Sequence, residues 1–185
     1  MILRFYAIFL LSGLIFNCSL YAQRAVELPN DSSGLYLTYD DFINGKITHG
    51  FPKYKKGYTL WPKGFFTNKD PELKTPDTSI VYKRADIWGY TDHRGKFIRI
   101  YKNKHYKVLC DKGLIIYIIY SPTKASYYFS KSMNEPICHL KMKNLTNIYA
   151  DNSAFLNKIN STKKKTWLTW DDKKERYFLN KLFLE

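Results

Sequence analysis

Residues 79–130 form a succession of short strand-like segments, and this pattern restricts the possible folds more than any other feature of the chain. The segments are rich in β-branched and aromatic residues, and the turns between them contain Gly, Asn or Asp. Connections this short join neighbouring antiparallel strands. The expected strands are 79–83, 87–91, 96–102, 106–110, 114–120 and 125–130. We therefore expect an antiparallel meander of about six strands, either open or barrel-like.

Two of these segments predict where they lie in the sheet. Segment 114–120 reads LIIYIIY and is apolar on both faces. At the edge of a sheet it would pair with other chains, so we expect it in the middle. Segment 96–102 should instead have two different faces, because successive side chains alternate across a strand. One face would carry Phe97, Arg99 and Tyr101, and the other Ile98 and Ile100.

Helical patterns occur on both sides of the strand region. Thr38 and Asp41 have the spacing of a capping box and Gly45 provides a stop, which predicts a short helix near Thr38. After the strands, apolar residues recur at helical spacing over 145–159, with capping residues at 151–153. These patterns predict two short helices after the sheet.

The remaining segments are less periodic. Residues 68–78, with two prolines, predict a loop, and 167–170 predict a helical turn. Residues 173–185 fit either a helix or a strand. The predicted fold class is α+β, with an antiparallel sheet of about six strands and short helices following it at the C-terminal end.

The N-terminus has the pattern of an export signal. Residues 1–22 contain one charged side chain, Arg4, and an apolar run that is shorter than the roughly 20 residues needed to cross a bilayer. Cleavage after Ala22 is expected. Lipid attachment at Cys18 is the less favoured alternative, because Asn17 stands where a small residue is required. We expect an exported protein, in the periplasm, at the outer surface or outside the cell.

Export divides the chain into a signal peptide at 1–22, a flexible leader at 23–33 and a single α+β domain at 34–185. No integral membrane span is expected after signal cleavage. The domain retains Cys110 and Cys138 in an oxidising compartment. They form either one disulfide or two separately buried thiols, and the sequence leaves both interpretations open.

A basic aromatic segment gives the candidate binding site. Residues 46–69 contain six lysines, six aromatic residues and no acid, in a chain of net charge +14. Lysines contact phosphates or sulfates and rings stack on bases or sugars, so this composition suits an anionic polymer. Strand pairs with one buried aromatic face would give the same pattern. The candidate ligand-binding residues are Lys53, Lys55, Lys56, Tyr58, Trp61 and Lys63.

The sequence contains no recognised catalytic motif: no Gly-x-Ser-x-Gly, His-Glu-x-x-His, phosphate-binding loop or paired Cys-x-x-Cys. Cys138 and His139 are adjacent, but neighbours in an extended segment point to opposite faces and cannot act together. We predict no catalytic residue, metal site or cofactor. The leading hypothesis is a non-catalytic envelope or secreted binding protein, whose partner is an anionic polymer or an envelope protein. The alternatives are a hydrolase of unrecognised type and a structural component of an envelope complex.

Several patches resemble one group of proteins. The signal ends in Ala22-Gln23, residues 34–45 read GLYLTYDDFING, and residues 86–95 read DIWGYTDHRG. Together with YFS at 128–130 and PICHL further on, their order is similar to that of uncharacterised exported proteins of Bacteroidetes-type bacteria. The resemblance implies location and ancestry but no activity or site. The stretch from Trp88 also resembles a single copy of a WG-type β repeat.

Overall fold

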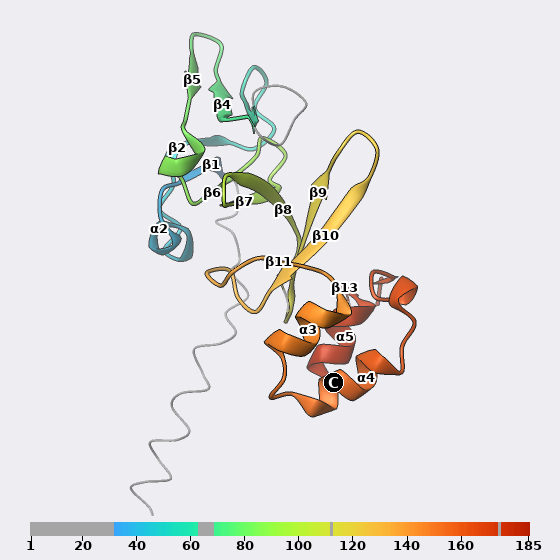
Figure 1. Ribbon diagram of the computed structural model, residues 1–185. Coiled ribbons are helices and arrows are strands. Elements are labelled where there is room, and N and C mark those ends of the chain that lie inside the picture. The colour runs from blue at the N-terminus through green and yellow to red at the C-terminus, as the bar shows by residue number, and fades with distance from the viewer. Residues whose placement is uncertain (1–31, 63–68, 112, 174) are drawn as a thin grey trace, which may run out of the picture.

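The computed structural model describes residues 32–62, 69–111, 113–173 and 175–185. The predicted signal peptide and residues 23–31 of the leader lie outside the described residues. The fold is α+β, as predicted, with antiparallel sheets and short helices that follow them. Figure 1 shows the helices α3, α4 and α5 gathered at the end of the molecule opposite β4 and β5.

The main element is an eight-stranded sheet with the order β11-β10-β9-β8-β7-β6-β1-β2, in which every neighbouring pair is antiparallel. The sheet is open, with β11 and β2 at its edges, so it has more strands than expected and is not closed. Its strands are β1 (Ser32–Tyr36), β2 (Thr48–Pro52), β6 (Gly89–Thr91), β7 (Phe97–Tyr101), β8 (Lys104–Cys110), β9 (Ile115–Tyr120), β10 (Ala125–Ser130) and β11 (Cys138–His139).

Five of the six predicted strands form the meander β6 to β10, and the sixth lies elsewhere. Strand β9, which was expected in the middle, lies between β8 and β10. Strand β1 begins at Ser32, two residues before the predicted start of the domain, and inserts between β6 and β2. Gly34 lies on β1 at a point where a Cβ atom would collide with the side chain of Ile47.

A second sheet covers one face of the first. It consists of β3 (Thr59–Pro62), β4 (Pro71–Lys74) and β5 (Ser79–Val81). The prediction of a loop over 68–78 is therefore wrong for residues 71–74, whereas residues 75–78 do form the turn between β4 and β5. Pro71 is tolerated because it is the first residue of β4, and Leu73 is buried between two polar neighbours. The apolar layer between the two sheets contains Leu35, Phe51, Leu60, Leu73, Ile87, Tyr90, Ile98 and Ile100.

The opposite face of the large sheet packs on helix α2 (Tyr39–Ile43). Thr38 and Asp41 form the predicted capping box, and Gly45 follows with φ 65°. Phe42 packs against Tyr36 and Phe97 at 5.3 and 4.5 Å between ring centroids. The expected alternation along β7 is confirmed, because Phe97 and Tyr101 face this layer while the two isoleucines face the small sheet.

The C-terminal helices cover the end of the sheet formed by β8, β9 and β10. They are α3 (Met142–Ile148), α4 (Ser153–Asn160) and α5 (Phe178–Leu184), with the 3-10 turn η3 (Lys164–Thr166) between α4 and α5. Asn152 caps α4 within the predicted capping segment. The predicted helical turn at 167–170 is wrong at its end, where β12 (Trp170–Asp171) pairs with β13 (Arg176–Tyr177). The ambiguous C-terminus contains both a short strand and a helix.

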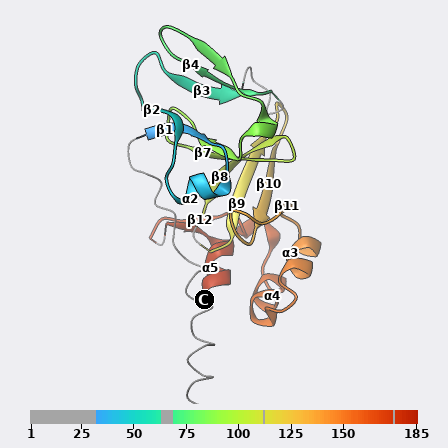
Figure 2. The ribbon, with the colours of Figure 1, turned by 90° about the vertical axis from the view of Figure 1, so that its left-hand side faces the viewer.

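Figure 2 shows β9 and β10 extending from the small-sheet end of the molecule to the helical end. The apolar cluster under the helices includes Leu145, Phe155, Ile159 and Trp167. Within the part of the chain that the structure describes, no helix has the length and apolar character needed to span a membrane.

Candidate functional site

The described part of the predicted basic aromatic segment, residues 46–62 and 69, contains β2, the connection between β2 and β3, and β3 itself. Lys55 and Lys56 are exposed in the turn after β2, and Trp61 on β3 is 42% exposed. Lys53 is half-buried, with its alkyl chain packed over Gly95. Lys63 lies outside the described residues. The described candidate lysines and the tryptophan therefore lie on one continuous surface segment.

The turn at 92–95 docks onto this segment. The backbone N–H of Tyr54 donates to the carbonyl of His93 at 2.9 Å, and the Tyr54 hydroxyl donates to the carbonyl of Arg94 at 3.1 Å. Tyr54 has φ 60° and its side chain is 75% exposed. These two hydrogen bonds hold an exposed ring beside the turn. Sequence reasoning did not select Tyr54 as a site residue, although its place in a turn that ends at Gly57 was a signal of exposure.

Trp61 lies against the same turn. The Arg94 guanidinium lies 5.5 Å from the Trp61 ring, and the His93 ring lies 4.7 Å from it at 64°. Asp92 keeps its carboxylate inside the turn, where Oδ1 accepts the backbone N–H groups of Arg94 and Lys96. The groups that this turn presents to Trp61 are therefore a cation and an imidazole ring. We call Lys53, Tyr54, Lys55, Trp61 and Arg94 the Tyr54–Trp61 surface.

Tyr58 has a different position from the one expected of a ligand-binding ring. It is half-buried and packs against Phe51 at 5.6 Å, at the margin of the layer between the two sheets. The ammonium of Lys55 lies 4.3 Å from the Tyr58 ring centroid. Tyr58 therefore supports the surface from below, and Tyr54 takes the exposed position that the sequence assigned to Tyr58.

A carboxylate also neighbours Trp61. Glu72 is directly opposite Trp61 in the β3–β4 pair, so the two side chains lie on the same face. The Glu72 carboxylate accepts a hydrogen bond from Ser79 and lies 3.8 Å from the ammonium of Lys74. Its charge is therefore partly balanced on β4 and β5.

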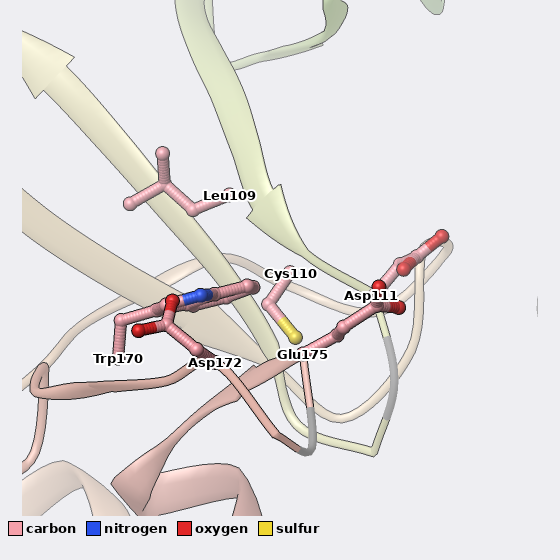
Figure 3. A pocket seen from close by; sticks show the side chains of 6 residues that line it. All are labelled: Leu109, Cys110, Asp111, Trp170, Asp172 and Glu175. Atoms are coloured by element: carbon pink, nitrogen blue, oxygen red, sulfur yellow. The ribbon is translucent and has the colours of Figure 1, made fainter.

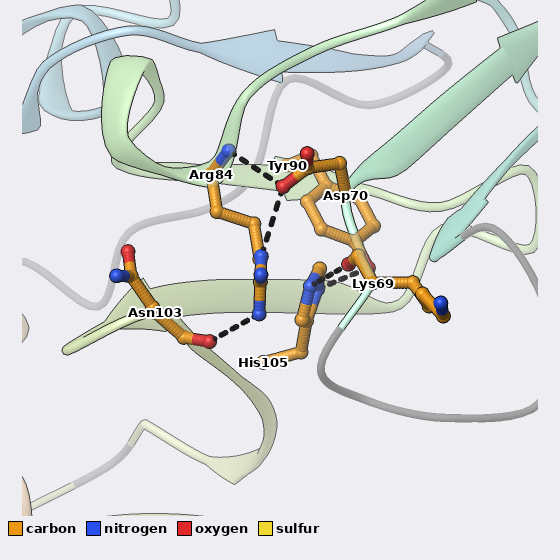
Figure 4. A network of polar contacts seen from close by, with 6 residues as sticks. All are labelled: Lys69, Asp70, Arg84, Tyr90, Asn103 and His105. Carbon is orange, nitrogen blue, oxygen red and sulfur yellow. Dashed lines mark hydrogen bonds and ion pairs between the residues drawn. The ribbon is translucent and has the colours of Figure 1, made fainter.

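A buried polar network joins the small sheet to the large one (Figure 4). His105 is 4% exposed, with Nδ1 3.0 Å from the Tyr90 hydroxyl and Nε2 2.8 Å from the carbonyl of Lys69. A carbonyl can only accept, so Nε2 carries the proton and Nδ1 accepts from Tyr90. Burial lowers the pKa of His105 to about 4, which keeps the imidazole neutral.

An ion pair extends this network. Arg84, in the 3-10 turn η2 (Arg84–Asp86), donates from Nε to the Asp70 carboxylate at 2.9 Å and from a terminal nitrogen to the carbonyl of Asn103 at 2.6 Å. The Arg84 hydrogen bonds lower the pKa of Asp70. Each of these groups has a structural partner, so His105 acts as a joint between the sheets and not as an exposed base.

A cavity of about 380 Å³ lies beside the β12–β13 hairpin (Figure 3). Leu109, Cys110 and Trp170 form apolar walls, and the carboxylates of Asp111, Asp172 and Glu175 stand around them. A second pocket, of about 220 Å³, includes His139. Among the described residues that line these two pockets, no histidine shares a pocket with a carboxylate.

The two cysteines occur as thiols. Cys138 pairs with Phe129, Phe129 with Ile116, and Ile116 with Cys110, so two strands separate the cysteines. Three strand spacings amount to about 14 Å, whereas a disulfide requires Cα atoms no more than about 7 Å apart. The structure therefore corresponds to the second interpretation, two separate thiols packed in the apolar cluster under the helices.

Cys138 and His139 point to opposite faces, as their adjacency in an extended segment predicts. Cys138 packs under the helices, while His139 lies 4.2 Å from the Tyr128 ring on the other face. Among the described residues no group of three or more His, Cys, Asp or Glu side chains is arranged to hold a metal ion. No family model, curated protein or solved structure matches this chain.

Proposed function

We propose that this protein is an exported, non-catalytic binding protein that holds an anionic polymer on the Tyr54–Trp61 surface. One observation carries the proposal: the turn at 92–95 docks beside Tyr54 and Trp61, so that Arg94 stands over the Trp61 ring. This contact joins rings and cations that are far apart in the sequence on one exposed surface.

The chemistry of this surface suits a chain of phosphates or sulfates that carries flat bases or sugars. Lys55 and Arg94 are exposed cations that can contact the charged groups. Tyr54 and Trp61 present ring area on which a base or sugar can stack, at about 1 to 3 kcal/mol per base. The net charge of +14 attracts polyanions from a distance.

Export rests on residues 1–22, and the bacterial source rests on the resemblance of the patches at 34–45 and 86–95. A hydrolase would be favoured by a cleft in which a histidine meets a carboxylate, and the two pockets described above separate these groups. Co-purification of the protein in a stable envelope complex would instead indicate a structural role.

The test is binding to a single-stranded oligonucleotide and to a sulfated polysaccharide as the salt concentration rises to 0.15 M, about the physiological ionic strength. Wild-type protein should keep measurable affinity, because ring stacking is much less sensitive to salt than charge contacts. Trp61→Ala should weaken binding about 5- to 150-fold, the range that corresponds to one stacked base. Lys55→Gln with Lys56→Gln should flatten the dependence of affinity on salt.

The matched control is Trp170→Ala, because Trp170 is 44% exposed, nearly the same as Trp61, but lies on β12. It should bind like the wild type. If affinity disappears by 0.15 M salt, or if the two tryptophan variants behave alike, then general positive charge explains the binding. The Tyr54–Trp61 surface would then have no role as a site.

A further inference from the structure

A second pocket lies at the β11 edge of the large sheet. β11 pairs with β10 through only two residue pairs, after which Leu140 donates its N–H to the carbonyl of Tyr127 and the chain turns into α3. A pocket of about 220 Å³ opens at this place, between β10 and η3. This volume is below the roughly 300 Å³ at which pockets for drug-sized ligands begin, so it suits a small molecule.

The polar side chains of the pocket are all donors or cations. They belong to Ser126, Tyr127, His139, Lys141, Lys164 and Trp167, and no carboxylate occurs among the described residues that line the pocket. Burial lowers the pKa of His139, and the positive charges of Lys141, Lys104 and Lys124 lower it further. Two cations line the pocket, Lys141 from the residue before α3 and Lys164 from η3. A bound anion would balance their charge, whereas a bound cation would be repelled.

A buried donor in the pocket wall has no partner. Trp167 is 1% exposed, and its Nε1–H makes no hydrogen bond within the described part of the chain. The indole nitrogen can only donate, and a buried donor without an acceptor destabilises the folded protein. Trp167 is one of the residues that line the pocket. The Nε1 atom is closed to solvent, so a ligand oxygen satisfies this nitrogen when the pocket wall shifts to admit it.

We propose that this pocket binds a small oxyanion attached to an apolar group, such as a phosphate monoester, a sulfate ester or a carboxylate. Lys141 and Lys164 pair with the charge, and Ser126 and Trp167 donate hydrogen bonds to its oxygens. The apolar group lies against Leu140 and other apolar residues of the wall. His139 is held in place by its ring contact with Tyr128.

The site shares no residue with the Tyr54–Trp61 surface, and the proposal is independent of polymer binding. The probe is phenyl phosphate, which is titrated into the ¹⁵N-labelled full-length protein. The Nε1–H resonance of Trp167 is followed by NMR during the titration. Phenol, which has the ring without the charge, is the matched ligand control. We expect a saturable shift of this resonance with phenyl phosphate and none with phenol at the same concentrations.

Variants of exposed lysines decide whether the pocket or the overall charge is responsible. Lys141→Gln with Lys164→Gln should raise the dissociation constant at least tenfold. Lys143→Gln with Lys173→Gln removes the same charge from exposed positions that do not line the pocket, and should leave the constant within twofold. All four side chains are exposed, so both double variants should fold.

A shift that does not saturate, or equal losses in the two double variants, would overturn the proposal. Equal shifts with phenol and phenyl phosphate would also overturn it, because the oxyanion would then contribute nothing. Trp61→Ala should leave phenyl phosphate binding unchanged. A failure of this site is therefore distinguishable from a failure of the polymer-binding surface.

Discussion

The large sheet is covered at its two ends by different structures that are attached in different ways. At the β8–β10 end the helices pack through an apolar cluster around Leu145, Phe155 and Trp167. At the other end, formed by β7, β6, β1 and β2, the small sheet also covers an apolar layer. Here hydrogen bonds of His105 and Arg84 also hold the margin of the small sheet to the large sheet. The helical cover therefore depends on packing and on a buried hydrogen bond from Asn180 of α5 to the carbonyl of Leu114, and neither of these groups titrates. The small sheet depends on packing and on protonation.

This difference predicts how each end responds to a change in conditions. Apolar packing is largely insensitive to pH, whereas a buried imidazole becomes unfavourable once it is protonated, because burial deprives the charged form of water. The small sheet should therefore loosen on acidification before the helices do. It is also the cover that carries Trp61, so the proposed polymer binding should weaken when the pH-sensitive end loosens.

The largest expected effect is at the helical end. Phe155 is 2% exposed and packs against Tyr149 and Phe183, each at 5.3 Å. Phe155→Ala should lower the free energy of unfolding by about 3 to 5 kcal/mol, because it leaves a cavity in the cluster. Urea denaturation followed by circular dichroism measures this loss. Ile80→Ala, at an exposed position on β5, should change stability by less than about 0.5 kcal/mol.

If the two substitutions had similar effects, the cluster under the helices would not be the main source of stability at that end. Apolar packing would then not be what attaches the helices to the large sheet.

The second effect is the dependence of stability on pH through His105. The unfolded chain takes up a proton at about pH 6.5, but the folded protein does so only at about pH 4. The stabilising effect is therefore complete above pH 6.5 and is lost as the pH falls from about 6.5 to 4. Between pH 7.5 and pH 5 this group should remove about 2 kcal/mol of stability.

The variant His105→Gln keeps a polar side chain but cannot titrate. It should be less stable than the wild type at pH 7.5 and should lose less stability on acidification to pH 5. Urea denaturation at the two pH values gives both quantities. Parallel losses in the two proteins would show that groups other than His105 control the acid response.

The smallest effect is expected at the Arg84–Asp70 ion pair, in which the Asp70 side chain is 39% exposed. Asp70→Ala should cost only about 0.5 to 1 kcal/mol, because water screens the pair. The loss should be local. Amide hydrogen exchange should accelerate in β4 and β5 and remain unchanged in α4. Acceleration throughout the chain would mean that the ion pair supports the whole fold.

Sequence patterns predicted the elements whose partners are close in the chain. The meander β6 to β10, the capping box at Thr38 and the cap at Asn152 all follow from spacings of a few residues. Strand β1 was missed because it pairs with segments that are distant in the sequence. Strand β4 was missed because it begins with a proline, which in a sequence indicates a loop. The ambiguity over 173–185 has a physical reason, since both a strand and a helix form there.

The candidate site was predicted as a segment but not as a surface. Composition located Trp61 and the lysines, but it did not distinguish Tyr54 from Tyr58, because exposure depends on which ring faces the turn at 92–95. That turn lies more than 30 residues away from either tyrosine. Arg94, which stands over Trp61, had no local signal that connected it to this segment.

The position of β1 determines the order in which the molecule can be assembled. β1 is the first strand among the described residues but lies inside the sheet, and its Tyr36 meets Thr91 of β6 across a separation of 55 residues. During synthesis the chain emerges N-terminus first. Strand β2, one neighbour of β1, therefore appears early, and the other neighbour, β6, appears much later. Contacts between distant residues slow folding, because a long loop must close before they form. We expect the meander β6 to β10 to form first and β1 to dock late, so the apolar residues of β1 stay exposed longest during synthesis.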